Sequence, residues 1–175
     1  MEHYDFKQNA AAPVALFVFN ELRRTQITIS ALQKNIGASA TDLFVFSDGG
    51  KDDLSWRQVN QLRSWLDTIG GFRSVNIIKR SANGRLEYNL VDGITEIVDK
   101  FGRVIVLEDD VVTHSDFLSY MNSALTHYFE KETVMHISAF NFIQPSDPCK
   151  TILWRYPESY GWATWKNRWA YFVHY

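Results

Sequence analysis

Cysteine and long apolar runs are the two features most clearly missing from this sequence. Cys149 is the only cysteine among 175 residues, which excludes an internal disulfide and any metal site built from several thiolates. No apolar stretch is long enough to span a bilayer, and the first residues lack the apolar core of a signal peptide. We therefore expect a cytoplasmic protein with no membrane span.

Excess charge and phosphate-binding glycine motifs are also missing. The formal net charge is −2, so nothing indicates general binding to nucleic acid or to an anionic membrane. The sequence contains no Gly-x-x-x-x-Gly-Lys-Ser/Thr segment, and no Gly-x-Gly-x-x-Gly follows its first predicted strand. These absences argue against a P-loop enzyme and against a dinucleotide-binding Rossmann domain.

What is present is a regular alternation of apolar strands and amphipathic helices. With 46% hydrophobic residues, we expect a loose arm over residues 1–12 and a single globular domain over 13–175. The predicted strands are 13–19, 43–46, 75–78, 104–107 and 134–140. The predicted helices are 25–36, one capped by Asp53, 86–101 and one beginning near Phe117. This order predicts an α/β fold with a doubly wound, mainly parallel sheet, followed by loops beyond residue 141.

Polar clusters follow four of the predicted strands. Glu108-Asp109-Asp110 comes directly after the strand 104–107. The other clusters are Asn20, Ser47-Asp48-Gly49-Gly50 and Asn83-Gly84-Arg85. Ligands of doubly wound sheets bind outside the carboxyl ends of the strands. We therefore expect the four clusters to lie along one edge.

The three adjacent acids have two interpretations, a solvated turn or half of a metal site. Carboxylates suit Mg²⁺ or Mn²⁺, whose coordination is commonly completed by water and substrate phosphates, so a nucleotide diphosphate is the simplest partner. Asp48 either accepts hydrogen bonds from a base or ribose, with the adjacent glycines letting a ligand approach, or it closes its own turn. Arg85 either binds a diphosphate or covers a helix start without function.

Four segments together carry a resemblance to a known family. They are 16–20, 45–49, 104–110 with the following Asp116-Phe117, and 137–141 with the later Gly161-Trp162 and Trp165. In this order they resemble nucleotide-sugar glycosyltransferases of the GT-A fold. The closest resemblance is to the type I N-acetylglucosaminyltransferase-like group and its bacterial relatives.

The resemblance implies a DXD-like metal site at the acids. Asp110 matches the direct ligand of Mn²⁺ (or Mg²⁺), Asp109 matches the residue near the donor ribose and sugar, and Glu108 lies behind them. In the same way Asp48 matches the acid that reads uracil. Asn20 lies where the first strand meets the nucleoside.

Two loops complete the implied site. Arg85 falls in the loop that approaches the donor, and Tyr160 and Gly161 fall in the segment that shapes the sugar or acceptor pocket. The implied function is metal-dependent, inverting transfer of a sugar, N-acetylglucosamine among the options, from a UDP-sugar to the hydroxyl of a glycan or another acceptor.

The sequence departs from the family pattern at two places. Many relatives have arginine after the asparagine of the first strand, whereas this chain has Glu21. No Asp or Glu follows Glu158, so the general base that inversion requires is expected beyond Tyr175, in a sequence truncated among its aromatic residues. We expect such a chain to bind nucleotide with metal and to turn over slowly or not at all.

Three other functions remain open. A nucleotidyltransferase shares the α/β layout and paired acids, although a basic glycine-rich loop is absent after the first strand. A phospho-acceptor regulatory domain would need a partnered lysine, and the predicted fifth strand offers Ser138 instead. A non-catalytic carbohydrate-binding or scaffolding module would use the tryptophan-rich end of the chain.

Overall fold

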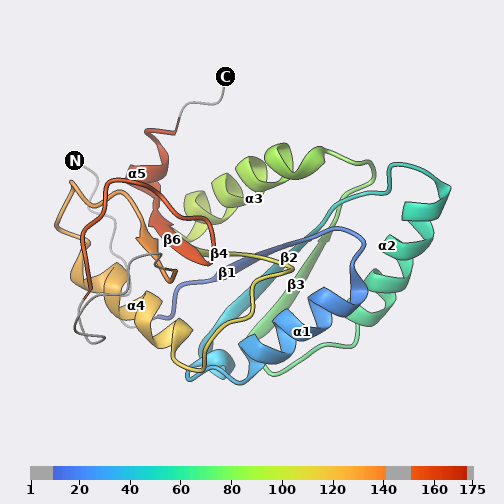
Figure 1. Cartoon of the computed structure of the whole chain (residues 1–175), viewed down its shortest axis with the longest axis horizontal. Helices are drawn as coiled ribbons and strands as arrows, with labels where there is room; N and C mark the ends of the chain where they lie inside the picture. Colours follow the sequence, from blue (N-terminus) through green and yellow to red (C-terminus); the bar gives the residue numbers. More distant parts are fainter. Residues whose placement is uncertain (1–9, 141–150, 173–175) are drawn as a thin grey trace.

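The structure is a computed structural model that describes residues 10–140 and 151–172. A six-stranded sheet in the order β3-β2-β1-β4-β6-β5 forms its centre (Figure 1). The strands are β1 Val14–Val18, β2 Asp42–Ser47, β3 Ser74–Lys79, β4 Arg103–Glu108, β5 Ile137–Ser138 and β6 Trp162–Trp165. The helices are α1 Leu22–Gln33, the 3₁₀ turn η1 Ala38–Ala40, α2 Asp53–Leu66, α3 Arg85–Phe101, α4 Phe117–His127 and α5 Lys166–Trp169.

The predicted α/β class with a mainly parallel sheet is confirmed. β1 pairs in parallel with β2 on one side and with β4 on the other, and β2 pairs in parallel with β3. Every residue of β1 is buried, because helices cover both faces of the sheet. β6 runs antiparallel to both β4 and β5, so the sheet is parallel only over its first four strands.

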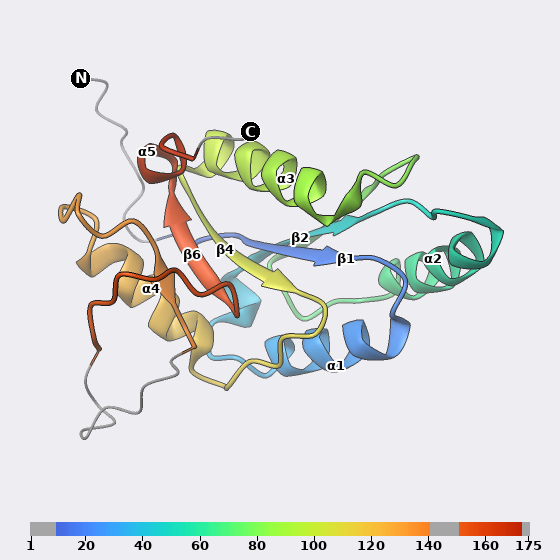
Figure 2. The ribbon, with the colours of Figure 1, turned by 45° about the horizontal axis from the view of Figure 1, so that its top comes forward.

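Two apolar cores lie on opposite faces of the sheet. One core packs α1, α2 and α4 against the sheet through residues such as Ile29, Leu62 and Met121. The other packs α3 through Ile94 and Ile97. Figure 2 shows this division, with α3 and α5 above the strands and α1 and α4 below them. Because β1 to β4 are parallel, their carboxyl ends lie along the same edge of the sheet.

Several predicted boundaries were wrong. β6 was expected to be loop, because four residues in an aromatic-rich stretch show no clear alternation, and its pairing with β4 decides its conformation. The strand predicted over 134–140 shortens to Ile137–Ser138, which pairs only with β6. α1 begins at Leu22 and not at residue 25. Asp52, one residue before the predicted cap, caps α2 by accepting from the Ser55 N–H.

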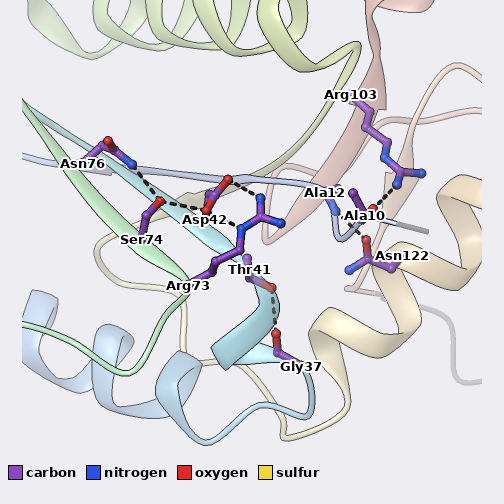
Figure 3. A network of polar contacts seen from close by, with 10 residues as sticks. All are labelled: Ala10, Ala12, Gly37, Thr41, Asp42, Arg73, Ser74, Asn76, Arg103 and Asn122. Atoms are coloured by element: carbon purple, nitrogen blue, oxygen red, sulfur yellow. Dashed lines mark hydrogen bonds and ion pairs between the residues drawn. The ribbon is translucent and has the colours of Figure 1, made fainter. Parts of the chain in front are cut away.

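The opposite, amino edge of the sheet is tied together by polar contacts (Figure 3). Asp42 forms an ion pair with Arg73 and accepts a hydrogen bond from the Ser74 hydroxyl at 2.7 Å. Ala12 is fully buried, and its N–H donates to Asn122 Oδ1 at 2.7 Å. The end of the expected arm is thus packed against α4.

Cys149 and Asn141, the latter part of the segment 137–141, lie outside the described residues, and so does the terminal Tyr175. In the described part of the chain, no helix is long and apolar enough to cross a membrane.

Candidate functional site

The loops that follow β1, β2, β3 and β4 are linked to one another at the carboxyl edge. The Phe19 N–H, just past β1, donates to Asp109 Oδ2 at 3.4 Å, at the end of β4. The Asp48 N–H donates to the Val18 carbonyl at 3.1 Å, which joins β2 to β1. The Asp48 side chain then reaches the loop after β3. Clusters far apart in sequence therefore lie along one edge.

The carboxylate of Asp48 is surrounded by hydrogen-bond donors. Its side chain is 5% exposed. Oδ1 accepts from the N–H groups of Gly49 and Gly84, both at 2.9 Å, and Oδ2 accepts from Asn83 Nδ2 at 3.0 Å. A carboxylate offers about four lone-pair positions. Asp48 closes its own turn and fixes the loop after β3, which leaves roughly one position for a ligand.

Arg63 on α2 clamps the ends of β2 and β3, and the sequence analysis missed it. Its Nη2 donates to the carbonyl oxygens of Ser47, Asp48 and Arg80 at 3.0, 3.1 and 2.7 Å. Its Nε donates to Ser47 Oγ at 3.0 Å. Burial lowers the pKa of Arg63, and the negative charge of Asp48 opposes that effect. A signal existed, because Arg63 lies four residues after the buried Val59 and so borders the apolar face of α2.

The two glycines after Asp48 pack closely against other parts of the chain. A Cβ on Gly49 would lie 2.4 Å from the carbonyl carbon of Ala82, and one on Gly50 would lie 2.5 Å from the Trp56 ring. The two glycines allow the chain to pack closely on itself. Whether a ligand also approaches their backbone stays a prediction.

Asn20 and Arg85 lie at the same edge without contacting the acids. Asn20 Nδ2 donates to Gln58 Oε1 on α2 at 2.8 Å. Arg85, the first residue of α3, has φ 65, and its N–H donates to Asn83 Oδ1 at 3.3 Å. Its side chain is exposed, so its guanidinium is accessible to an anion.

The three consecutive acids differ in environment. Burial raises the pKa of Glu108, and the charges of Asp110 and Asp109 raise it further. Burial also raises the pKa of Asp109, and the Phe19 N–H opposes this effect while Asp110 adds to it. Asp110 alone is exposed. Negative charge is thus concentrated where one carboxylate opens to solvent, and a cation would relieve the repulsion.

A pocket of about 630 Å³ begins at Asp110. Its lining comes from the loop after β4, the start of α4 and the segments beside β5 and β6. The lining residues are Asp110, Val111, Val112, Thr113, His114, Asp116, Phe117, Tyr120, Ala139, Phe140 and Tyr160. Phe140 and Tyr160 meet edge to face with ring centroids 5.2 Å apart. The structure therefore brings Asp110 and Tyr160 to one pocket, whereas Asn20, Asp48 and Arg85 lie outside its lining.

Gly161 lies next to Tyr160 and packs against Phe117, and both of these neighbours line the pocket. Gly161 has φ 71, and a Cβ there would lie 3.0 Å from the Phe117 ring. Any other residue would be strained by the left-handed backbone and would press on that ring. Gly161 therefore sets the close approach of β6 to α4 beside Tyr160.

The chain alone offers a divalent cation only part of a coordination shell. Among residues 10–140 and 151–172, no group of three His, Cys, Asp or Glu side chains is placed to hold a metal. Asp110 supplies an accessible carboxylate oxygen, which is the donor type that Mg²⁺ and Mn²⁺ prefer. The residues present fit a cation that shares its remaining positions with water and a phosphate-bearing ligand.

Comparison with known proteins bears on the fold. Neither a family model nor a curated protein sequence matches this chain. Among solved structures, the chain is similar to the mannosyltransferase PcManGT from Pyrobaculum calidifontis in complex with GDP-Man and Mn²⁺. The TM-score is 0.50 at 13% identity, over 76% of this chain and 36% of that one. The fold is of the GT-A type.

Residues 1–349 of S. aureus TarS are also similar, with a TM-score of 0.49 and 10% identity over 67% of this chain and 33% of that chain. The same protein in complex with UDP-GlcNAc gives a TM-score of 0.47 at 11% identity, over 67% of this chain and 32% of that one. The chain thus spans about a third of the length of these neighbours. At this level of identity the similarity concerns the fold alone.

Proposed function

We propose that the protein is a metal-dependent glycosyltransferase that transfers a sugar from a UDP-sugar to an acceptor hydroxyl with inversion. One observation carries the proposal. Asp110, the exposed member of a crowded acidic triplet, opens into a pocket of about 630 Å³ whose other walls are largely apolar and aromatic. A pocket of this size, largely apolar and with a few polar groups that include the carboxylates of Asp110 and Asp116, is typical of a small-molecule site.

The acids and Arg85 would hold the diphosphate of the donor. Asp110 would bind Mn²⁺ or Mg²⁺ together with the donor phosphates, and the bound metal would neutralise charge on the leaving diphosphate. Asp109 would lie beside the donor ribose and sugar, with Glu108 behind it. The exposed guanidinium of Arg85 would add positive charge at the same edge.

The nucleoside would lie across the ends of β1 and β2. Asn20 lies at the end of β1, and its side-chain oxygen is not used by the bond to Gln58. Asp48 keeps roughly one lone-pair position, which suits an N–H donor such as that of uracil. Because Arg63, Asn83 and Gly84 fix the position of Asp48, this contact would need little rearrangement.

The aromatic part of the pocket would take the reacting sugar and the acceptor. Sugar rings have apolar C–H faces that pack against aromatic side chains, and Phe140 and Tyr160 provide such surfaces beside Asp110. Gly161 keeps this wall close to Phe117. N-acetylglucosamine as the transferred sugar follows from the resemblance of the sequence segments.

No Asp or Glu follows Glu158 in the 175 residues, so the proposal names no general base. A base must reach the acceptor hydroxyl within hydrogen-bond distance. Donor binding and turnover are therefore separate expectations, and the first is tested directly.

The test is the thermal midpoint of the protein with UDP, GDP or CDP, each with and without Mn²⁺. Ligand at about a hundred times its dissociation constant adds roughly 2.7 kcal/mol, or about 5–10 °C for a chain of this size. We expect a metal-dependent shift with UDP that Asp110→Ala abolishes and Glu96→Gln, an exposed change on α3, retains. The absence of a shift with every nucleotide would contradict the proposal.

A further inference from the structure

A second pocket, of about 350 Å³, lies at the amino edge of the sheet. It is bounded by the start of β4, the turn that carries η1 and the outer side of α4. Its lining residues are Ala10, Ala11, Ile36, Gly37, Ala40, Thr41, Arg103, Leu118, Ser119, Asn122, Ser123 and Thr126. None of these residues is acidic and one is basic. The pocket is at the opposite end of β4 from Asp110, so the proposed donor site does not use it.

Arg103 is a cation without an acidic partner in the described part of the chain. Its Nη2 donates to the Ala10 carbonyl, and Figure 3 shows the guanidinium directed toward Ala10 beside Asn122. Burial lowers the pKa of Arg103, and no carboxylate among residues 10–140 and 151–172 counteracts that effect. Arg73 on the same edge is different, because Asp42 pairs with it. Arg103 therefore retains most of its five N–H donors for another acceptor.

Hydroxyl groups from α4 line the same pocket. Ser119 and Ser123 are four residues apart and so lie on one face of the helix. Both are exposed, and neither side chain forms a hydrogen bond within the described residues. Asn122 is engaged differently, since its Oδ1 accepts from Ala12 and its Nδ2 donates to Leu118. One guanidinium and two uncommitted hydroxyls thus line the cavity.

We propose that this pocket binds a phosphate group through the guanidinium of Arg103 and the hydroxyls of Ser119 and Ser123. A guanidinium matches the spacing of phosphate oxygens with two parallel N–H donors, and hydroxyls donate to the remaining oxygens. The lack of any acidic lining residue removes the repulsion that an anion would meet at the opposite edge. The volume admits a phosphate with a small attached group, such as a sugar monophosphate.

The test is an NMR titration of the intact 175-residue protein with inorganic phosphate at low ionic strength. We expect saturable shifts of the amide signals of Arg103, Ser119 and Ser123. Arg103→Met should weaken binding about tenfold or more, since a charge-assisted contact is lost. Arg57→Met removes an exposed arginine of α2 and should leave the affinity unchanged.

Two further variants keep the test decisive if Arg103→Met fails to fold. Ser119→Ala with Ser123→Ala changes only exposed hydroxyls, and it should weaken phosphate binding several-fold. Ser123→Glu leaves Arg103 in place and supplies a competing carboxylate, so it should abolish binding. Saturable binding that survives Ser123→Glu, or that Arg57→Met weakens equally, would overturn the proposal, and so would shifts that never saturate.

A sugar monophosphate and the same sugar without phosphate identify the form that binds. Tighter binding of the sugar monophosphate than of inorganic phosphate, with the same response to Ser123→Glu, assigns the pocket to a phosphorylated small molecule. Equal affinity for the sugar monophosphate and for inorganic phosphate would show that the pocket recognises the phosphate group alone. Binding of the unphosphorylated sugar with similar affinity would overturn the recognition of phosphate.

Discussion

The Nη2 atom of Arg63 donates a hydrogen bond to the backbone carbonyl of Asp48 at 3.1 Å. The carboxylate of Asp48 in turn accepts hydrogen bonds from the backbone N–H groups of two glycines. The same Nη2 also reaches the carbonyls of Ser47 and Arg80. The loops after β2 and β3 are thus held by one guanidinium from α2. The proposed nucleoside contact depends on this clamp.

Replacement of Arg63 by Met should destabilise the fold by roughly 2–3 kcal/mol, because hydrogen bonds from a charged donor are lost and the carbonyls of Asp48 and Arg80 lose this donor. The stability of Arg63→Lys should lie between that of Arg63→Met and that of the unchanged protein, because an ammonium group keeps the charge but reaches fewer carbonyls. Urea denaturation measures both effects. Arg57→Met is the matched control on the exposed side of α2, and equal stability of the two Met variants would contradict the clamp.

Replacement of Asp48 separates the loss of hydrogen bonds from the loss of charge. Asp48→Ala leaves the N–H groups of Gly49 and Gly84 without an acceptor, at a cost of about 1–3 kcal/mol for each buried group. Asp48→Asn keeps one side-chain oxygen for them and should recover much of that stability. Hydrogen exchange of the two glycine amides is the measurement. Identical exchange in both variants would show that the carboxylate does not hold these loops.

Asp109→Asn should stabilise the ligand-free protein at neutral pH. The raised pKa means that the folded state binds the proton more tightly than the unfolded chain. Folding stability therefore falls as the pH rises through the interval between the ordinary and the raised pKa. The Asn variant removes this cost and its side-chain oxygen can still accept from the Phe19 N–H.

The gain should be below about 1 kcal/mol, because Asp109 is partly exposed to solvent. It should vanish at about pH 3, where the carboxyl is protonated in both states. Urea denaturation at the two pH values measures it. An equal gain at both would assign the effect to something other than ionisation. Under the proposed function, the same variant should bind the UDP–metal complex more weakly.

Gly93→Ala should lower the free energy of unfolding by about 1–3 kcal/mol, even though alanine has a higher helix propensity than glycine. A Cβ at this buried position in α3 would lie 2.8 Å from the Phe17 ring and 3.0 Å from the Phe46 ring. Those rings are stacked at 5.0 Å, so neither can move freely. Gly70→Ala, where a Cβ meets nothing within 4 Å, is the control for thermal unfolding. Similar midpoints for both variants would contradict close packing at Gly93.

The fold was largely predictable because its first four strands are short, buried and separated by amphipathic helices. Periodicity locates such elements, and it found β1 to β4 and the long helices within a few residues. β6 was not predictable in this way, because four residues are too few to show a periodicity. Its conformation depends on pairing with β4, which is distant in sequence. The observed helix ends differ from the predicted ones where a capping residue sets them, as Asp52 does for α2.

The candidate site was predictable only where residues lie at strand ends. The topology of a parallel sheet placed Asp48, Asp109 and Asp110 at one edge, but it gave no information on which of them would be exposed. Arg63 was missed because a residue on a helix face reaches the edge only through the length of its side chain. Periodicity could not predict the pocket, since its walls come from segments distant in sequence, and only the family resemblance had placed Tyr160 at a pocket.

The antiparallel pairing of Trp162–Trp165 with β4 also has a consequence for synthesis of the protein. Domains begin to fold while the chain is still being made, amino-terminal elements first. Strands β1 to β4 are complete long before β6 emerges, so the outer side of β4 is at first an unpaired strand edge of Val and Ile residues. Such an edge is a template for pairing with another chain. β6 therefore protects the nascent protein from aggregation, and slow translation before residue 162 should prolong the vulnerable interval.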